Sequence, residues 1–192
     1  MSRQSKTRPP HAEPAPESNS AGPAPSIGFP PIARADARLL ILGSLPGAVS
    51  LARREYYAQP QNSFWPILGS LLGFDHALAY DERTQCLLEH RIALWDVCRS
   101  GVRLGSLDSA IRRETILPND FGSFLPAQSC LCAVAFNGRA AESLYRSLVL
   151  PTLPTKAAAL PLLRLPSTSP AYASLRFAEK LAHWRVVLDW LA

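Results

Sequence analysis

The sequence predicts an α/β fold, a three-layer α/β/α sandwich around a central, mostly parallel sheet of four strands. Four short apolar runs have the length of buried strands, and helix-length segments separate them. Strands that alternate with helices form parallel sheets with helices on both faces. A chain of 192 residues, 47% of them hydrophobic, can bury one full core. The expected strands are residues 39–42, 92–97, 131–136 and 160–165.

The helices follow from apolar spacing and from residues that cap helix ends. Ser106 is placed to cap the third expected helix, and Asn119 or Asp120 the fourth. The last helix should begin at Ser169, because Pro170 is favoured at a first helical position. The expected helices are residues 64–72, 81–89, 107–113, 121–125, 139–148 and 169–190.

Residues 1–33 differ in composition from the rest of the chain. They are rich in Pro, Ala and Ser, with almost no large apolar side chain before Ile27. Such a segment cannot bury enough surface to offset its ordering entropy, so we expect a disordered tail and one domain over residues 34–192. No apolar stretch of a secretory signal follows the basic start, and no run has the length of a membrane span. The sequence predicts a cytoplasmic monomer with no membrane contact.

Charge and cysteine content bear on the partners. The formal net charge of +5 and the pI near 9.3 suit a polyanionic partner, although many basic proteins bind none. The four cysteines form no C-x-x-C motif and the histidines are scattered, so we expect no metal site. Buried thiols in a reducing compartment are the expected state of the cysteines.

Two motifs follow the first expected strand. Residues 43–47 read Gly-Ser-Leu-Pro-Gly and continue directly from the strand, at the edge where open α/β sheets bind ligands. Residues 56–65, Tyr-Tyr-Ala-Gln-Pro-Gln-Asn-Ser-Phe-Trp, surround the amide of Asn62 with aromatic rings. Taken alone, Gly43 and Gly47 are best explained by a tight turn, and Asn62 is as well explained by a helix cap as by a role at a site. The Gly-x-Ser-x-Gly elbow of a serine hydrolase is absent, because Gly43 directly precedes Ser44.

The other strand ends also carry polar turns. Asp96 ends the second strand, and Asn137 precedes Gly138 after the third. Residues 165–171, Leu-Pro-Ser-Thr-Ser-Pro-Ala, present hydroxyls and backbone N–H groups after the fourth. Asp96 is a helix cap or a pocket wall, and Asn137 is a turn residue or a pocket residue; the pattern leaves these alternatives open.

These turns, in this order, resemble the uracil-DNA glycosylase superfamily, and most closely its hypoxanthine-DNA (deoxyinosine) glycosylase family. The resemblance covers nearly all of the chain from Arg38 to the C-terminus. Each motif is weak alone, whereas six in order are specific. The motifs are residues 43–47 with Ser50-Leu51 close behind, 56–65, 106–108, 119–121, 136–138 and 165–171.

The resemblance implies a monofunctional DNA glycosylase that uses base flipping and water attack on the sugar and leaves an abasic site. Its partner would be DNA containing deaminated bases, hypoxanthine first and then uracil or xanthine, and it would need no cofactor. No lysine stands near the motifs as a Schiff-base nucleophile, so strand cleavage is not expected. Two alternatives stay open: a uracil- or mismatch-specific glycosylase of the same fold, and a non-catalytic DNA-binding module.

This chain departs from the superfamily at the position of the catalytic residue in the first motif. Many relatives have a catalytic Asn or Asp as the third residue of the first motif, where this chain has Leu45, which can neither orient nor activate water. The resemblance puts this duty on Asn62. Leu165 likewise stands where many relatives have a His before Pro-Ser, so the departing base would rely on neutral hydrogen bonds.

The resemblance also implies the remaining site residues. Tyr57 occupies the position at which relatives stack an aromatic ring on the flipped base. Leu45, Asp96 and Asn137 are the other expected base-binding residues. The expected phosphate-binding residues are Ser44, Gly47, Ser167, Thr168 and Ser169.

Overall fold

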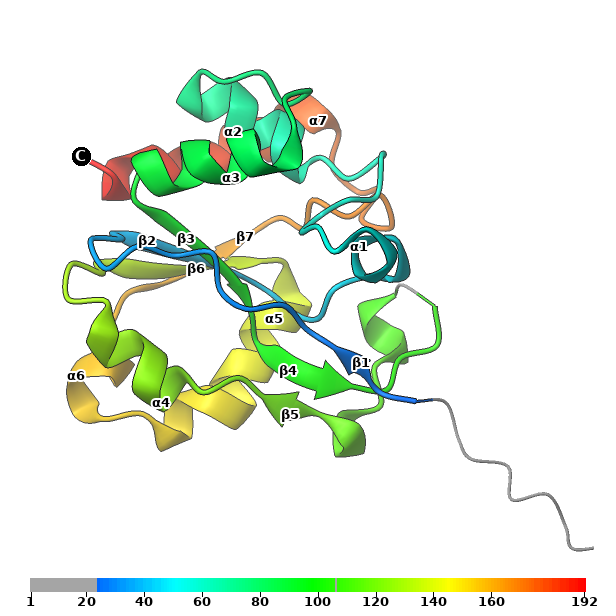
Figure 1. Ribbon diagram of the computed structural model, residues 1–192, viewed down its shortest axis with the longest axis vertical. Coiled ribbons are helices and arrows are strands. Elements are labelled where there is room, and N and C mark those ends of the chain that lie inside the picture. The colour runs from blue at the N-terminus through cyan, green and yellow to red at the C-terminus, as the bar shows by residue number, and fades with distance from the viewer. Residues whose placement is uncertain (1–23, 106) are drawn as a thin grey trace, which may run out of the picture.

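A four-stranded parallel sheet forms the centre of the molecule (Figure 1). The computed structural model describes residues 24–105 and 107–192, so the expected cap Ser106 and residues 1–23 of the expected tail lie outside the described residues. The sheet order is β3-β2-β6-β7, and every neighbouring pair is parallel. The predicted sheet is confirmed. Its strands are β2 (Leu39–Gly43), β3 (Ile92–Asp96), β6 (Ala133–Asn137) and β7 (Leu162–Leu165).

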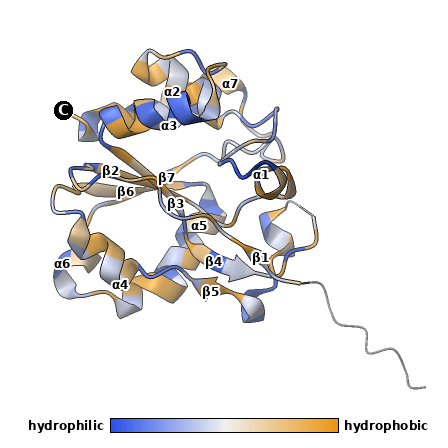
Figure 2. Ribbon diagram, in the orientation of Figure 1, coloured by the Kyte–Doolittle hydropathy of each residue, from blue (hydrophilic) through white to orange (hydrophobic). Residues whose placement is uncertain are grey.

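Helices cover both faces of this sheet, which confirms the three-layer sandwich (Figure 1). One layer contains α2 (Phe64–Leu72), α3 (Tyr80–Glu89) and α7 (Phe177–Trp184). The opposite layer contains α4 (Phe121–Phe124), α5 (Arg139–Leu144) and α6 (Thr155–Ala158). Every residue of β2, β3 and β6 is buried, and apolar residues run along the central strands (Figure 2). The uninterrupted apolar runs of these strands therefore reflect burial on both faces.

The short connecting elements complete the fold. The α1 helix (Ala48–Arg53) follows the first motif, and Asp120 caps α4 by accepting a hydrogen bond from the Ser123 N–H at 3.0 Å. The α5 helix stops four residues earlier than expected and continues as a π-helical turn. The remaining turns are Tyr145–Val149 and the 3₁₀ segments Leu125–Ala127, Leu150–Thr152 and Arg185–Trp190.

A second sheet was not predicted from the sequence. It contains β1 (Ser26–Ile27), β4 (Cys98–Gly101) and β5 (Leu117–Pro118), in the antiparallel order β1-β4-β5. The expected helix over residues 107–113 is wrong, because this stretch connects β4 to β5 and forms only the short turns Asp108–Ala110 and Arg113–Thr115. Strands of two to four residues carry too little periodicity to be read from a sequence.

The domain's contacts begin before residue 34, the expected boundary. Ile32 and Leu94 exchange two backbone hydrogen bonds, at 2.9 and 2.8 Å. The Trp95 indole N–H donates to the carbonyl oxygen of Phe29 at 3.0 Å. Residues 26–32 therefore pair with the domain, because β3 and β4 offer backbone partners along their edges that the composition of the segment does not reveal.

The last helix begins later than expected, at Phe177 rather than Ser169. The Ser169 hydroxyl oxygen accepts a hydrogen bond from the Ala171 N–H at 3.2 Å, and the Ser169 carbonyl accepts one from the Tyr172 N–H at 3.0 Å. Ser169 and Pro170 therefore start a turn, which is a competing use of a Ser-Pro pair. The prediction of a helix N-terminus at Ser169 was wrong.

Candidate active site

A cavity of about 360 Å³ opens at the carboxyl ends of β2, β3 and β6, beside the turn that follows β7. Carboxyl ends of parallel strands meet at one edge of a sheet, so motifs far apart in the sequence converge there. The volume suits a small planar ligand such as a nucleobase. All ten residues expected at the site line this cavity: Ser44, Leu45, Gly47, Tyr57, Asn62, Asp96, Asn137, Ser167, Thr168 and Ser169.

Tyr57 is held in a strained backbone conformation at the cavity wall. Its φ is +55°, a value that aromatic residues rarely adopt. Its ring stacks on Phe64 with 3.9 Å between centroids and 18° between planes. The Tyr57 hydroxyl is buried without a hydrogen-bond partner among the described residues. Such strain persists only where the surroundings impose it, and here it aims a fixed aromatic ring at the cavity.

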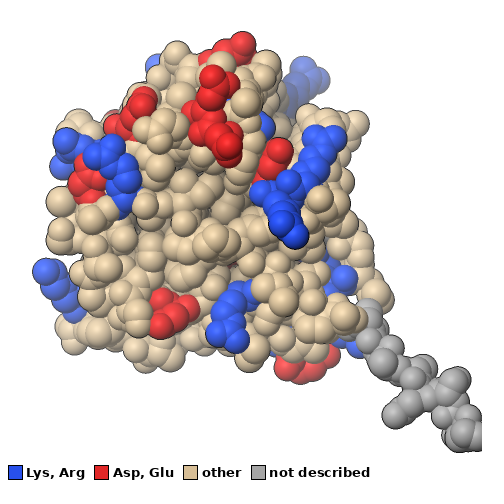
Figure 3. Space-filling model, in the orientation of Figure 1, with Lys and Arg blue, Asp and Glu red and all other residues tan. Residues whose placement is uncertain are grey.

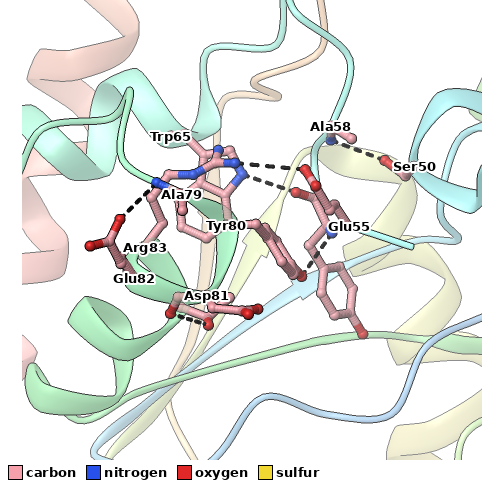
Figure 4. Close-up of polar contacts among 11 residues, drawn as sticks. Ser50, Glu55, Ala58, Trp65, Ala79, Tyr80, Asp81, Glu82 and Arg83 are labelled. Atoms are coloured by element: carbon pink, nitrogen blue, oxygen red, sulfur yellow. Dashed lines mark hydrogen bonds and ion pairs between the residues drawn. The ribbon is translucent and has the colours of Figure 1, made fainter. Parts of the chain in front are cut away.

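The surroundings that impose this conformation come from α1, α2 and α3 (Figure 4). The backbone on both sides of Tyr57 is tied down: the Tyr56 N–H donates to the Tyr80 hydroxyl at 3.0 Å, and the Ala58 N–H donates to Ser50 Oγ at 3.2 Å. The Trp65 indole N–H donates to the Tyr56 carbonyl at 2.9 Å. Arg83 lies over the Trp65 ring and pairs with Glu55 at 3.7 Å, which fixes the indole in turn (Figure 4).

Asp96 forms part of the cavity floor and is only 3% exposed. Its Oδ2 has no hydrogen-bond partner among the described residues, whereas its backbone carbonyl accepts a hydrogen bond from the Asn119 amide nitrogen at 2.8 Å. Asp96 lies opposite Gly43 in the strand register. Burial, with repulsion from Asp108 and a partial offset from Arg103, raises the pKa of Asp96 to about 7. The carboxyl therefore changes charge near neutral pH inside the cavity.

The raised pKa makes stability depend on pH in a defined direction. Between pH 4 and 7 the folded chain keeps a proton on Asp96 that the unfolded chain has lost, so the free energy of unfolding falls as pH rises. Across this window the free energy of unfolding of Asp96→Asn, relative to that of the wild type, should rise by on the order of 2–4 kcal/mol. Urea unfolding at several pH values measures this difference. Asp189→Asn, at an exposed position, is the control. An Asp96→Asn difference that stays constant with pH would contradict this account.

A charged pair beside the floor, formed by the buried Arg103 and the exposed Asp108, was not predicted as part of the site. Asp108 accepts a hydrogen bond from Ser44 Oγ at 2.5 Å and pairs with Arg103 at 3.6 Å. The Arg103 side chain is 2% exposed, and it donates to the carbonyl of Leu45 at 3.1 Å and to that of Pro46. This cluster holds the first motif in shape. Asp108 belongs to one of the resembling motifs and could have been found, whereas nothing around Arg103 in the sequence marks it.

Asn137 ties the turn after β7 to the end of β6. Its amide nitrogen donates to the Thr168 hydroxyl, and its amide oxygen accepts from the Thr168 N–H, both at 2.8 Å. The Thr168 carbonyl accepts from the Ser63 N–H at 3.0 Å. Thr168 is fully buried, so its hydroxyl and N–H hold the turn and leave direct contacts with a ligand to its neighbours Ser167 and Ser169.

Asn62 is half-buried at the cavity wall. Its amide oxygen accepts a hydrogen bond from the Phe64 N–H at 3.0 Å, at the start of α2. Its amide nitrogen makes no hydrogen bond within the described residues and is free to donate to a ligand or a water. The local cap and the expected role at the site are therefore compatible.

Two other expectations concern metals and membranes. Among residues 24–105 and 107–192, no three His, Cys, Asp or Glu side chains come together as metal ligands. In the same part of the chain, the helices are too short or too polar to cross a bilayer. The four cysteine thiols are free, and only Cys98 among them is buried.

Comparison with known proteins agrees with this geometry. Residues 30–192 match the family described as the Uracil DNA glycosylase superfamily. A hypoxanthine DNA glycosylase from Methanosarcina barkeri is 42% identical over 113 residues, which are 58% of this chain and 70% of that protein. One from Methanosarcina acetivorans is 40% identical over 115 residues, 59% of this chain and 72% of that protein.

A solved structure shares the fold. It is a solution NMR structure from Methanosarcina acetivorans, described as a candidate uracil DNA glycosylase. It is 34% identical in sequence, aligns with 86% of this chain and 99% of its own, and has a TM-score of 0.69. The chain therefore belongs to the uracil-DNA glycosylase superfamily and is a DNA glycosylase.

Proposed function

We propose that this glycosylase removes deaminated bases from DNA, hypoxanthine first and also uracil or xanthine, and leaves an abasic site. The two hypoxanthine DNA glycosylases that it resembles support this choice of substrate. The nucleotide would be flipped into the cavity, which costs least for a base that is mispaired. A uracil- or mismatch-directed enzyme of the same fold is the alternative that the substrate assay below separates.

One observation carries the proposal: Asp96 Oδ2, a buried carboxylate oxygen, lies at the cavity without a hydrogen-bond partner among the described residues. A buried polar atom without a partner costs free energy, and a hydrogen bond from a ligand in the cavity would offset that cost. Hypoxanthine, xanthine and uracil each present a ring N–H beside a carbonyl, where adenine and cytosine present a ring acceptor beside an amino group. An ionised Asp96 accepts from the ring N–H, so the cavity complements the base edge that deaminated bases share with guanine and thymine and that adenine and cytosine lack.

The other residues would divide the reaction among them. Cleavage of the base–sugar bond passes through an oxocarbenium-like state, and the free amide N–H of Asn62 would orient the attacking water. The Tyr57 ring would stack on the base, and Leu45 would close the apolar side of the cavity. Asn137 would act through the turn that it holds.

Contacts with the DNA backbone would come from the rim of the cavity. The hydroxyls of Ser167 and Ser169 accept local hydrogen bonds, which leaves their hydrogens to donate to phosphate oxygens. The Gly47 backbone lies on the same rim. Basic side chains are scattered over the face seen in Figure 3. These short polar contacts would fix the position of the protein along DNA without reading its sequence.

The position of Lys180, the lysine nearest the cavity, supports a glycosylase that releases the base without cutting the DNA strand. Lys180 lies outside the motifs in the sequence. In the structure its Nζ donates a hydrogen bond to the Ser169 carbonyl at 3.3 Å. It is 4% exposed and does not line the cavity. A Schiff base with the sugar would need this amine to reach the cavity, so we expect an abasic product without strand cleavage.

A base-release assay tests the proposal. Oligonucleotides with one inosine, uracil, xanthine or adenine are incubated with the full chain, then split into untreated and alkali-treated samples. We expect alkali-dependent cleavage with inosine, less with uracil or xanthine, none with adenine, and no cleavage without alkali. Release of uracil alone would favour the alternative enzyme. Binding to DNA without release of any base would favour a non-catalytic module.

A further inference from the structure

Lys180 is a buried cation that the proposed reaction does not use. The residue is 4% exposed, and none of the ion pairs among the described residues includes it. Its Nζ donates to the Ser169 carbonyl at 3.3 Å and lies 5.4 Å from the centre of the Tyr172 ring. Burial lowers the pKa of Lys180, because water no longer stabilises the charged form. The described residues therefore hold this charge without a carboxylate that would offset the cost of burying it.

Neutral donors already hold the turn that runs from β7 to α7 (Figure 1). The Trp184 indole N–H donates to the Pro166 carbonyl at 2.9 Å, and Trp184 lies one helical turn beyond Lys180 on α7. The Asn137 amide holds Thr168 through two hydrogen bonds of 2.8 Å. A neutral donor at position 180 would support the turn at a lower desolvation cost than an ammonium does. Support of the turn alone therefore does not account for a lysine here.

The same turn presents its other side to the cavity. Ser167 and Ser169 line the cavity, and their hydroxyl oxygens accept local hydrogen bonds, which leaves the hydrogens to donate. Lys180 does not line the cavity, so Ser169 stands between the ammonium and the rim. A phosphate on the Ser169 hydroxyl would be separated from Nζ by the width of one residue. Charges this close attract each other through protein, which screens them less than water and salt do.

We propose that Lys180 attracts and positions the DNA phosphate that binds at Ser167 and Ser169, and that this phosphate offsets the buried positive charge. This role rests on the proposed function. The two hydroxyls offer hydrogen bonds without charge, and the ammonium behind them supplies charge without touching the DNA. Lys180 is a positioning residue, because it acts on the phosphate through the turn that carries the hydroxyls.

Variants at position 180 separate charge from support. Lys180→Gln removes the charge and keeps an N–H donor, Lys180→Met removes both, and Lys180→Arg keeps the charge. The probe is a duplex whose inosine carries a 2′-fluoro sugar, which slows base release during gel-shift titration. We expect Lys180→Gln and Lys180→Met to bind it about 10-fold more weakly at low salt. The slope of log Kd against the logarithm of the salt concentration should be smaller by about one.

Two further variants complete the comparison. Lys180→Arg should keep most of the wild-type affinity and salt dependence, because the charge stays behind the turn. Lys156→Met removes an exposed lysine on α6, in the opposite helix layer, and is the matched control. It should bind the duplex as the wild type does.

A second measurement identifies the phosphate and distinguishes the charge from the fold. Each phosphate near the inosine is replaced in turn by an uncharged methylphosphonate, and binding by the wild type is compared with binding by Lys180→Gln. At the phosphate that Lys180 attracts, the wild type should lose about 10-fold in affinity and the variant little, so the two losses do not add. A general loosening of the turn would instead weaken the variant by the same factor on every duplex.

Two results would overturn the inference: losses that add at every phosphate, or a Lys180→Gln variant with wild-type affinity and salt dependence. Should Lys180→Gln fail to fold, as judged by its melting temperature, the same comparison is made with Lys180→Met. A wild-type protein that releases no base from any substrate would contradict the proposed function, and the binding measurements would still judge Lys180.

Discussion

Asn62→Ala should lower the single-turnover rate of inosine release by about 10²- to 10³-fold, the usual cost of losing one hydrogen-bond donor that acts in a transition state. The amide nitrogen of Asn62 lies in the cavity wall and has no partner among the described residues, so its removal takes away a donor that this part of the chain does not otherwise use. Binding of the inosine duplex should change much less than the rate. Gel-shift titration and single-turnover assays at matched protein concentrations measure the two quantities.

Asn62 also accepts a hydrogen bond from the Phe64 N–H, so a control must separate the cap from the chemistry. Asn62→Asp keeps an acceptor for that N–H and removes the amide donor. Its melting temperature should stay close to that of the wild type, so a change in base release then reports the replacement of the amide by a carboxylate and not the loss of the cap. The assignment of Asn62 fails if Asn62→Ala binds and releases hypoxanthine as the wild type does.

Gly43→Ala should displace the side chains of Asp96 and Tyr57 at the cavity and so lower both stability and base release. A Cβ at this position would overlap Asp96 Oδ1 and lie 2.9 Å from the Tyr57 hydroxyl, too close for either group to stay in place. Both groups would have to move, and Asp96 lies on β3, every residue of which is buried. We expect a loss of about 1–3 kcal/mol in the free energy of unfolding and a roughly 10²-fold loss of base release. Urea unfolding and the single-turnover assay give the two values.

Two further variants make this prediction specific. Gly101→Ala, on β4, is the matched control, because its Cβ would make only ordinary contacts of 3.6 Å or more. The double variant Gly43→Ala with Asp96→Ala removes the closer clash, so it should recover part of the stability but not the base release. Wild-type base release by Gly43→Ala would show that the floor groups can shift freely, against this account of the site.

The central sheet and the edge of the site were predictable from residue patterns. Buried parallel strands need apolar residues on both faces, and residues 39–42 and 92–96 show this as unbroken apolar runs. Once the strands are parallel, the motifs that follow them must meet at one edge. The expected site residues therefore line one cavity although they come from segments more than 120 positions apart. Their individual roles stay predictions.

Other features depend on partners that local sequence does not reveal. Residues 26–32 look like a tail by composition, yet β3 and β4 supply backbone hydrogen bonds that pair with them. Ser169 and Pro170 are compatible with either a helix start or a turn. The turn forms here, next to Thr168, whose N–H donates a hydrogen bond to the Asn137 amide oxygen. Arg103 resembles any other basic residue in the sequence. Its importance follows from burial against the carbonyls of Leu45 and Pro46.

The sequence by itself determined the layered fold, the family and the set of side chains at the sheet edge, because strand periodicity and motif order are local properties of the chain. Tertiary structure alone decided the state of those side chains. Asp96 has a raised pKa, and Tyr57 an unpaired hydroxyl, only because neighbouring elements exclude water and leave them without partners. Charge state and hydrogen bonding depend on what surrounds a group in space, and those surroundings come from distant parts of the chain.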